Sequence, residues 1–301
     1  MSVTRYTVAM SNYNMAETIE MSVTSVVGQL DDRFEVLVVD DGSTDGSVEI
    51  LERLEEEYDI LRVCYDAGND NLAEARNYSF EEARGDYVLA SLDTDDQYTQ
   101  CIREFVDLYH QFEAGFDGDF FLLGVGLYIA PRDLLLDVPY RSLGYGEDRD
   151  FFRRLIANGS LLSLEHRNVE YSLGYDRSLR ERFDVGFETM AVQFQSGLHF
   201  WPYVRWAYEE IREEGGQELE WYRGLAHLVF APLAYLRSLR GPRYEAPPEF
   251  TDIGRYKEAV RRTHMTAEEM ADQLGIEIDW EAVGPRGRAI FDVNEAGIII
   301  D

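Results

Sequence analysis

Two hydrophobic periods alternate along residues 6–91. Short runs of apolar or β-branched residues predict strands, and apolar residues spaced three or four positions apart predict helices. The predicted strands are 6–10, 34–39, 61–64 and 87–91, and the predicted helices are 16–27, 44–58 and 72–83. Strands that alternate with helices are typical of an α/β layer fold, so we predict a sheet flanked by helices.

The pattern beyond residue 95 predicts fewer strands and more helices. Helices are expected at 97–113 and 149–158, with one strand between them at 120–130. From about residue 175 the chain becomes rich in aromatic residues and mainly helical. We therefore expect an α/β domain at 1–175, a helical region at 176–245 and an acidic extension at 246–301.

The expected extension has its own local signals. Prolines 242, 247 and 248 mark a linker before it. Thr266 and Glu269 have the spacing of a capping box, which predicts a helix that runs through Leu274. Residues 296–301 could form an edge strand or pair with a partner.

Polar clusters follow three of the predicted strands. In open α/β sheets, ligands bind beyond the carboxyl ends of the strands, so several such clusters predict one site. Each cluster alone could be a turn or a helix N-cap, because Asn, Asp, Ser and Thr favour both. Their joint occurrence favours a site. The clusters are Ser11-Asn12-Tyr13-Asn14, Asp40-Asp41-Gly42-Ser43 and Asp93-Thr94-Asp95-Asp96.

The acidic run at 93–96 has the most distinctive chemistry. Its carboxylates follow a buried strand, where their repulsion is costly unless a cation or paired donors compensate it. Oxygen ligands suit Mg²⁺ or Mn²⁺, which also bind substrate phosphates. The alternatives are a solvated acidic loop and a cap of the helix expected at 97–113. A phosphate-loop site is excluded, because no glycine-rich phosphate-binding motif follows a strand.

The charge balance is strongly acidic. The 301 residues include 58 Asp and Glu against 28 Lys and Arg, a net charge of −30, and Lys257 is the only lysine. Such a surface repels nucleic acid phosphates, so we expect no nucleic acid partner. With 45% hydrophobic residues the chain is not disordered. The spread of charge along the chain predicts adaptation to high salt, where screening makes the repulsion tolerable.

Several features predict a cytoplasmic protein. Cys64 and Cys101 are too few for a disulfide framework, which fits a reducing compartment. The N-terminal residues lead straight into a strand without the pattern of a secretory signal. No apolar run reaches the roughly 18 residues of a membrane span.

Residues 187–245 combine aromatic and apolar residues with flanking arginines. The apolar run 225–236 is too short to span a bilayer, but its basic flanks suit an interfacial helix. Alternatively, the region packs against the first domain or a second subunit. Peripheral contact with the inner face of the cell membrane and an oligomer both follow as open alternatives.

Six segments between residues 4 and 160 resemble the family 2 glycosyltransferases, and their occurrence in this order makes the resemblance specific. They are 8–14 (VAMSNYN), 35–47 (EVLVVDDGSTDGS), 71–77 (NLAEARN), 83–88 (ARGDYV), 93–96 (DTDD) and 144–155 (GYGEDRDFFRRL). The resemblance implies the GT-A fold, a Rossmann-like mixed sheet flanked by helices, here with a mainly helical C-terminal region. It also implies an inverting, metal-dependent sugar transfer from a nucleotide-diphosphate donor, and the composition indicates a haloarchaeal type.

The resemblance further implies residue roles. Asp95 would ligate Mg²⁺ or Mn²⁺ on the donor diphosphate together with Asp93, and Asp96 would do so in an alternative register. Asp148 of the Glu147-Asp148 pair would be the base that takes the proton of the acceptor hydroxyl. Contacts with the nucleotide sugar are implied for Ser11, Asn12, Tyr13, Asn14, Asp40, Asp41, Arg76, Asp93 and Thr94.

The chain departs from the family pattern in two places. Ser11 stands where the family usually has proline before its polar pair. The interval between Asp95 and Asp148 is short, so acceptor-binding elements could lie in the C-terminal part. His166 could be a third metal ligand, since neutral imidazole binds such ions, or a strand-end surface histidine.

The donor and acceptor are less specified than the reaction. UDP-sugars are the commonest donors in the family, and a glycan or polyprenyl-linked acceptor is expected. One alternative is a sugar nucleotidyltransferase, which would want a glycine-rich basic loop after the first strand. A second is a non-catalytic protein that binds a sugar nucleotide or acts as a scaffold.

Overall fold

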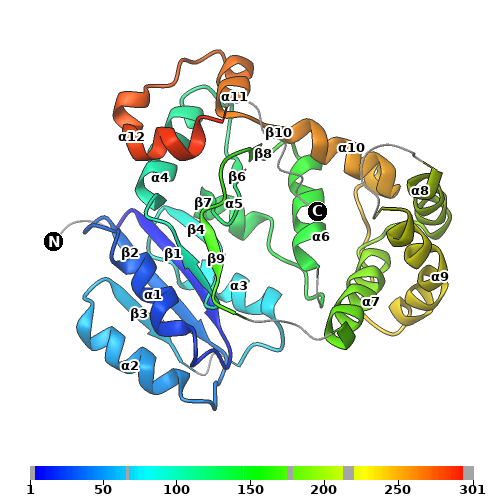
Figure 1. Cartoon of the computed structure of the whole chain (residues 1–301), viewed down its shortest axis with the longest axis horizontal. Helices are drawn as coiled ribbons and strands as arrows, with labels where there is room; N and C mark the ends of the chain where they lie inside the picture. The colour runs from blue at the N-terminus through cyan, green and yellow to red at the C-terminus, as the bar shows by residue number, and fades with distance from the viewer. Residues whose placement is uncertain (1–3, 66–67, 145, 175–178, 213–219, 294–301) are drawn as a thin grey trace. The chain divides into compact units, whose positions relative to one another are not determined.

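The chain forms two compact units. Its structure, a computed structural model, describes residues 4–65, 68–144, 146–174, 179–212 and 220–293 (Figure 1). Unit 1 comprises residues 1–139, 160–175 and 263–301, and unit 2 comprises residues 140–159 and 176–262. This division differs from the three consecutive parts expected from the sequence, because both units are assembled from separate segments.

Unit 1 is built on an eight-stranded mixed sheet with the order β10-β8-β6-β7-β4-β1-β2-β3 (Figure 1). Strand β1 lies between β2 and β4 and is parallel to both, whereas β7 is antiparallel to β4 and β6. The predicted mixed α/β fold is confirmed. The strands are β1 Tyr6–Asn12, β2 Phe34–Asp40, β3 Leu61–Cys64, β4 Tyr87–Asp93, β6 Phe121–Leu123, β7 Tyr128–Pro131, β8 Leu161–Leu164 and β10 His264–Met265.

Helices cover both faces of this sheet. Every residue of β2 is buried, as expected for a strand with both faces covered. Helices α1 (Ile19–Val27), α2 (Ser47–Glu57) and α4 (Ile102–Glu113) share one core with Val8 and Val36. Helix α3 (Leu72–Glu82) packs on β1 and β2, and its buried residues lie outside that core. Helix α5 (Arg132–Asp137) packs beside α3.

Two predicted elements were wrong in their type or extent. The helix expected at 97–113 is shorter, because Asp96–Tyr98 forms strand β5, which pairs with β9 (Glu170–Ser172). The single strand expected at 120–130 is the antiparallel pair β6–β7. Gly126 closes their turn with φ 77°, a conformation that strands do not adopt.

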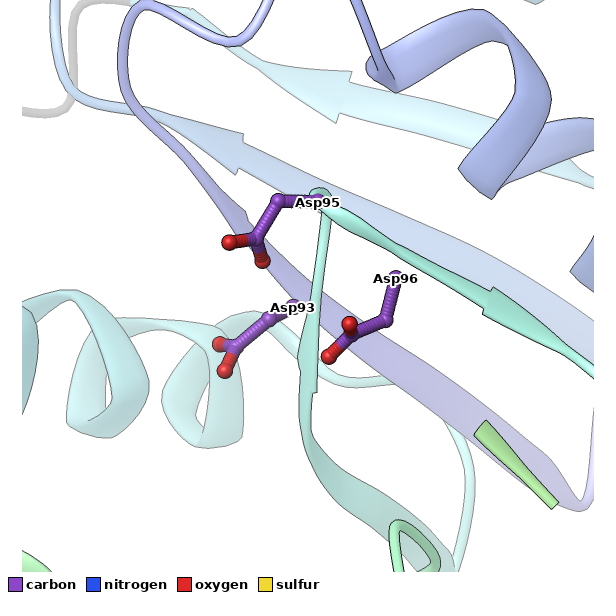
Figure 2. A group of neighbouring side chains, drawn as sticks. All are labelled: Asp93, Asp95 and Asp96. Atoms are coloured by element: carbon purple, nitrogen blue, oxygen red, sulfur yellow. The ribbon is translucent and has the colours of Figure 1, made fainter. Parts of the chain in front are cut away.

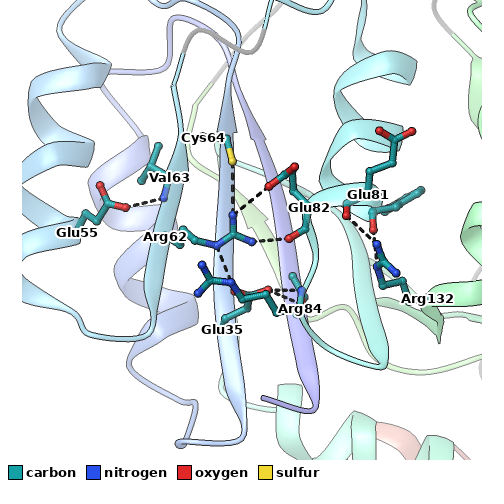
Figure 3. A network of polar contacts seen from close by, with 11 residues as sticks. Glu35, Glu55, Arg62, Val63, Cys64, Glu81, Glu82, Arg84 and Arg132 are labelled. Atoms are coloured by element: carbon teal, nitrogen blue, oxygen red, sulfur yellow. Dashed lines mark hydrogen bonds and ion pairs between the residues drawn. The ribbon is translucent and has the colours of Figure 1, made fainter. Parts of the chain in front are cut away.

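A buried carboxylate explains the turn before β4 (Figure 3). Glu35 accepts hydrogen bonds from the Thr7 hydroxyl (2.8 Å) and the Arg84 backbone N–H (2.7 Å), and Arg62 lies 3.4 Å away as an ion pair. The N–H of Gly85 donates to Thr7 Oγ1 at 3.0 Å. A Cβ on Gly85 would lie 2.6 Å from the backbone of Tyr6, so only glycine fits. The 83–88 segment therefore holds β4 in register with β1.

The residues expected as an acidic extension return to unit 1. Strand β10 pairs with β8, and helix α12 (Trp280–Phe291) packs on α4. Helix α11 (Ala267–Leu274) begins at the predicted capping box, with Thr266 and Glu269 bonding reciprocally, so that prediction is confirmed. The strand considered for residues 296–301 lies outside the described residues.

Unit 2 is helical, as predicted for the region after residue 175. Aromatic residues of α7, α8 and α9 form its core, with Phe194, Tyr203 and Trp206 buried. Arg153 is fully buried and donates to Gln193 Oε1 (2.6 Å) and Ser196 Oγ (3.0 Å), which ties α6 to α7. The helices are α6 Glu147–Ala157, α7 Leu179–Gln195, α8 Phe200–Arg212, α9 Glu220–Ser238, α10 Ile253–Thr263 and the 3₁₀ turn Pro248–Phe250.

Among the residues that the structure describes, none of the helices is both long and apolar enough to cross a bilayer.

Candidate functional site

The three polar clusters meet at the carboxyl ends of adjacent strands. Strand register places Asn12 of β1 opposite Asp40 of β2, and Ser11 opposite Asp93 of β4. Because β1 is the middle strand of the three, the clusters lie side by side at the carboxyl ends of the strands. We call this end of the sheet the site edge. The sequence-based prediction that these residues converge is confirmed by this register.

Asp40 is the structural centre of this edge. Its side chain has no exposed surface, and Oδ2 accepts from Asn12 Nδ2 (2.6 Å) and Ser43 Oγ (2.6 Å). Its Oδ1 accepts from the backbone N–H groups of Gly42 (3.1 Å) and Ser43 (3.0 Å). A carboxylate has about four acceptor positions, so this one is fully used by the protein. Asp40 therefore holds the loop after β2 against the end of β1.

The loop after β1 is hydrogen-bonded to the loop after β2 that Asp40 holds. Asn14 adopts a left-handed conformation with φ 54°, which Asn tolerates better than most residues. Its N–H donates to Ser43 Oγ at 2.8 Å, and its side-chain oxygen accepts from the Thr44 N–H at 2.8 Å. Tyr13, between these anchors, is 59% exposed. Tyr13 thus presents an aromatic ring to solvent from a loop that is hydrogen-bonded to the loop after β2.

Asp41 differs from its neighbour Asp40 in being only partly buried. Asn69 donates to Asp41 Oδ1 at 2.7 Å. Burial raises the pKa of Asp41, and the Asn69 hydrogen bond opposes the rise. Asp41 thus keeps acceptor positions that Asp40 has lost to its four partners.

The acidic run forms a compact cluster (Figure 2). Asp93 ends β4 and Asp96 begins β5, and one carboxylate oxygen from each of Asp93, Asp95 and Asp96 lies within 4.8 Å of the other two. Thr94 is buried and donates to the Ser11 carbonyl (3.1 Å) and Asn12 Oδ1 (3.0 Å), so the cluster is fixed to β1. Helix α4 begins only at Ile102, with Cys101 at its N-cap. The alternative that these carboxylates cap the following helix is therefore wrong.

Electrostatics at the cluster favour a cation. Burial, followed by repulsion from Glu170, Asp95 and Asp93, raises the pKa of Asp96 to about 7. Burial and the charges of Asp93 and Asp95 also raise the pKa of Glu170. Arg76 of α3 brings a positive charge to 3.9 Å from Asp93. Three converging oxygen donors in an electronegative setting fit a hard divalent ion such as Mg²⁺ or Mn²⁺.

His166 lies elsewhere in unit 1 and is fully buried. Its Nε2 accepts from the Val125 N–H at 2.7 Å, and Nδ1 donates to the Arg167 carbonyl at 2.7 Å. Burial lowers its pKa to about 4. Both ring nitrogens are engaged by the backbone, so this arrangement gives no support to the hypothesis of a third metal ligand. The alternative prediction, a surface histidine at a strand end, is wrong because His166 is buried.

Glu147 and Asp148 belong to unit 2, at the start of α6. Gly146, with φ 91°, is the N-cap, so Asp148 lies in the first turn of the helix. Its Oδ1 accepts from the Arg149 N–H at 2.8 Å, and a carboxylate there is stabilised as the anion by the helix dipole. Next in this turn, Asp150 is fully buried between Arg141 and Arg154, each at 3.1 Å. That pairing anchors the turn that carries Asp148.

Comparison with known proteins identifies the family. Residues 7–154 match the model of glycosyl transferase family 2. The chain belongs to glycosyl transferase family 2.

Curated relatives of this family 2 chain match it over its N-terminal part. It is 41% identical to the glycosyltransferase TuaG of Bacillus subtilis over 87 residues, 29% of this chain and 34% of TuaG. It is 32% identical over 102 residues to the cholesterol galactosyltransferase of Borreliella burgdorferi, 34% of this chain and 27% of that protein. It is 38% identical over 85 residues to glycosyltransferase AglE of Haloferax volcanii, 28% of each chain. The matches thus span about a third or less of these relatives' length.

Solved structures share the fold of this family 2 chain. Glucosyl-3-phosphoglycerate synthase of Mycobacterium tuberculosis matches with a TM-score of 0.53, 18% identity, and coverage of 64% of this chain and 79% of that chain. S. aureus TarS in complex with UDP-GlcNAc matches with a TM-score of 0.50, 18% identity, and coverage of 86% and 80%. Together with the mixed sheet, these similarities show the GT-A type of fold.

Three residues of the family 2 site edge were not found from the sequence. Glu170 adds a carboxylate beside the acidic cluster, Tyr98 closes the 93–98 turn by accepting from the Asp93 N–H at 2.8 Å, and Asn69 fixes Asp41. Glu170 faces the cluster only because β9 pairs with β5, far apart along the chain. Asn69 precedes the recognisable 71–77 segment, which is the one local signal that could have indicated it.

Proposed function

We propose that this chain transfers a sugar from a nucleotide-diphosphate donor to an acceptor hydroxyl with inversion at the anomeric carbon. The observation that carries the proposal is the cluster of Asp93, Asp95 and Asp96 at the end of β4, beside the braced ends of β1 and β2. Glycosyl transferase family 2 membership supports the reaction class. A divalent ion bound there would neutralise the charge that develops on the leaving diphosphate.

The residues divide the work of donor binding. Asp41 has free acceptor positions and is therefore the better candidate to bind the nucleobase of the donor. The carboxylate of Asp40 is fully used by hydrogen bonds within the protein. Tyr13 offers an exposed ring for stacking on the base. Arg76 beside Asp93 supplies positive charge on the diphosphate side. Ser11, Asn12, Asn14 and Thr94 hold these groups in place and complete the nucleotide-sugar site.

The acceptor is activated by a carboxylate in this proposal. Asp148 lies in the first turn of α6, at the end of the helix where the dipole favours negative charge. It would take the proton of the acceptor hydroxyl as that oxygen attacks the anomeric carbon. Glu147 is buried beside it and would position the turn.

UDP is the donor nucleotide that we propose. The structural neighbours TarS and glucosyl-3-phosphoglycerate synthase were solved with UDP-GlcNAc and with Mn²⁺ and UDP-glucose, respectively. The acceptor would be a glycan or a polyprenyl-linked sugar, and the second would bring the chain to the inner face of the cell membrane.

Donor binding and hydrolysis test the site directly. Thermal shifts with UDP-, GDP- and dTDP-sugars, each with Mg²⁺ or Mn²⁺ in molar salt, should show stabilisation by a UDP-sugar that needs the ion. Asp95→Ala should remove both the ion-dependent shift and donor hydrolysis, whereas Asp117→Asn, an exposed acid of the same unit, should change neither. Ion-dependent binding without hydrolysis or transfer would favour the non-catalytic alternative. Nucleotidyl transfer from a nucleoside triphosphate to a sugar phosphate would favour a nucleotidyltransferase.

We also propose that the chain works in high salt. Its net charge of −30 and single lysine support this, as does the match to AglE of Haloferax volcanii. Dialysis into dilute buffer should unfold unit 1, because unscreened repulsion between its carboxylates opposes the compact state. An unchanged melting temperature between molar and millimolar salt would contradict this proposal.

A further inference from the structure

The outer face of α9 carries a stripe of exposed apolar side chains. Its five residues are each between 45% and 59% exposed and recur three or four positions apart: Leu225, Val229, Leu233, Leu236 and Leu239. This spacing places them on one side of the helix and its C-terminal end. The buried Ala231 and Ala234 occupy the other side, in the core of unit 2. We call these five residues the α9 stripe.

The charged residues of segment 221–244, which carries the α9 stripe, are all arginines, and Arg237 among them pairs with Glu188 of α7 at 3.1 Å. No Asp or Glu occurs between residues 221 and 244, although the chain has 58 of them. Arg237, Arg240 and Arg243 are exposed at the C-terminal end of the stripe. Acidic and basic residues are equal in number in unit 2, so the whole net charge of −30 belongs to unit 1. Unit 2 is therefore the part of the chain that an anionic surface does not repel.

An exposed tryptophan lies at the same end. Trp201, at the start of α8, is 76% exposed. With Tyr235 of α9 and Arg243 it lines a hollow of about 430 Å³. Tryptophan is enriched at membrane–water interfaces, where its ring lies at the level of the headgroups and its N–H can bond to polar groups.

A second copy of the chain is a poor occupant for the α9 stripe. Pairing two stripes in parallel would bring Arg240 against its own copy. Pairing them antiparallel would bring it toward the end that carries Arg223, and segment 221–244 has no carboxylate to pair with it. Phosphate headgroups would supply the missing negative charge, and acyl chains would take up the apolar side chains.

We propose that the α9 stripe binds the surface of a bilayer that contains anionic lipids, with Arg240 and Arg243 on headgroup phosphates and Trp201 at the boundary. The inference rests on the proposed function only in that a lipid-linked acceptor gives the contact a purpose. The contact itself needs neither donor nor metal ion, so a vesicle-binding assay can fail or succeed independently of transfer.

Flotation with vesicles of phosphatidylglycerol and phosphatidylcholine tests the proposal. The full chain is used at the lowest salt at which its far-UV circular dichroism is unchanged. The wild type should float with the vesicles, and the triple variant V229Q/L233Q/L236Q should lower the bound fraction by about tenfold or more. These positions are exposed, so the variant should keep its melting temperature. The matched control M21Q/L136Q changes exposed apolar residues of unit 1 and should float like the wild type.

The charge part is tested with R240Q/R243Q, which should weaken binding to phosphatidylglycerol vesicles about tenfold. The control R261Q/R262Q removes the same charge from α10 of unit 2 and should have little effect. Emission of Trp201 should shift to the blue on binding, as judged against W201F. Flotation that is absent in the wild type, or equal in wild type and triple variant, would overturn the proposal. So would a wild-type dimer that the triple variant converts to a monomer.

Discussion

Unit 1 concentrates the charge and the polar motifs of the chain, whereas unit 2 is neutral and built from helices with aromatic cores. In unit 1 short motifs at strand ends meet because parallel strands bring their carboxyl ends to one edge. In unit 2 the proposed base Asp148 depends on a helix that Arg153 and Asp150 hold through buried polar contacts. Local sequence is therefore informative about the first unit and much less so about the second.

The largest expected effect separates binding in unit 1 from proton transfer in unit 2. Asp148→Asn should lower kcat by about 10³-fold, because an amide cannot accept the proton of the acceptor hydroxyl. The affinity for UDP and the metal ion, measured by calorimetry, should stay within about twofold of the wild type, since the site proposed for them lies in unit 1. The control Asp184→Asn alters an exposed acid of unit 2 and should leave turnover unchanged. Near-normal turnover of Asp148→Asn would remove this residue as the base.

Loss of the hydrogen bonds of the buried Asp40 carboxylate should show the next largest effect. Asp40→Asn replaces one acceptor oxygen with a donor and leaves a buried N–H or hydroxyl unpaired, which should cost unit 1 about 3 kcal/mol. Urea unfolding followed by hydrogen exchange would assign this loss to unit 1, and Asp32→Asn, an exposed acid before β2, is the control. If Asp40→Asn keeps its stability but loses UDP binding, Asp40 contacts the nucleotide, and its hydrogen bonds within the protein contribute little to stability.

The buried His166 makes unit 1 sensitive to pH. Its pKa of about 4 in the folded state is below its ordinary value, so the unfolded chain binds the proton first as pH falls. This contribution to stability is present above about pH 6.5 and is lost as pH drops toward 4. It should amount to about 2 kcal/mol between pH 7 and pH 5. His166→Gln should remove that part of the pH dependence without changing Mn²⁺ affinity, and a loss of Mn²⁺ binding would instead restore His166 as a ligand.

The smallest effect concerns the assignment of the C-terminal residues to unit 1. Thr266→Ala removes the capping box of α11 and should destabilise by about 1 kcal/mol. Hydrogen exchange should increase in α11 and in the neighbouring β8 and β10. Thr263→Ala, three residues earlier, serves as the comparison. Faster exchange confined to α11 would mean that the C-terminal residues add little to the sheet.

Part of the site could be predicted from residues alone, and part could not. Asp93, Asp95 and Asp96 could be grouped from the sequence because they follow one predicted strand closely and two other strands also end in polar clusters. The roles of Asp40 and His166 could not be predicted, because whether a polar side chain faces a ligand or the backbone depends on its neighbours in space. The β5 strand was missed because its partner β9 lies far along the chain.

The sequence by itself determined the alternation of strands and helices, the acidic composition and the order of the family motifs, since these depend on local periodicity and residue type. Only the tertiary structure decided that residues 263–293 complete the sheet unit, that Asp40 is fully bonded, and that the α9 stripe is exposed. Those features depend on which distant segments pack together, and burial and hydrogen-bond partners exist only once that packing is in place.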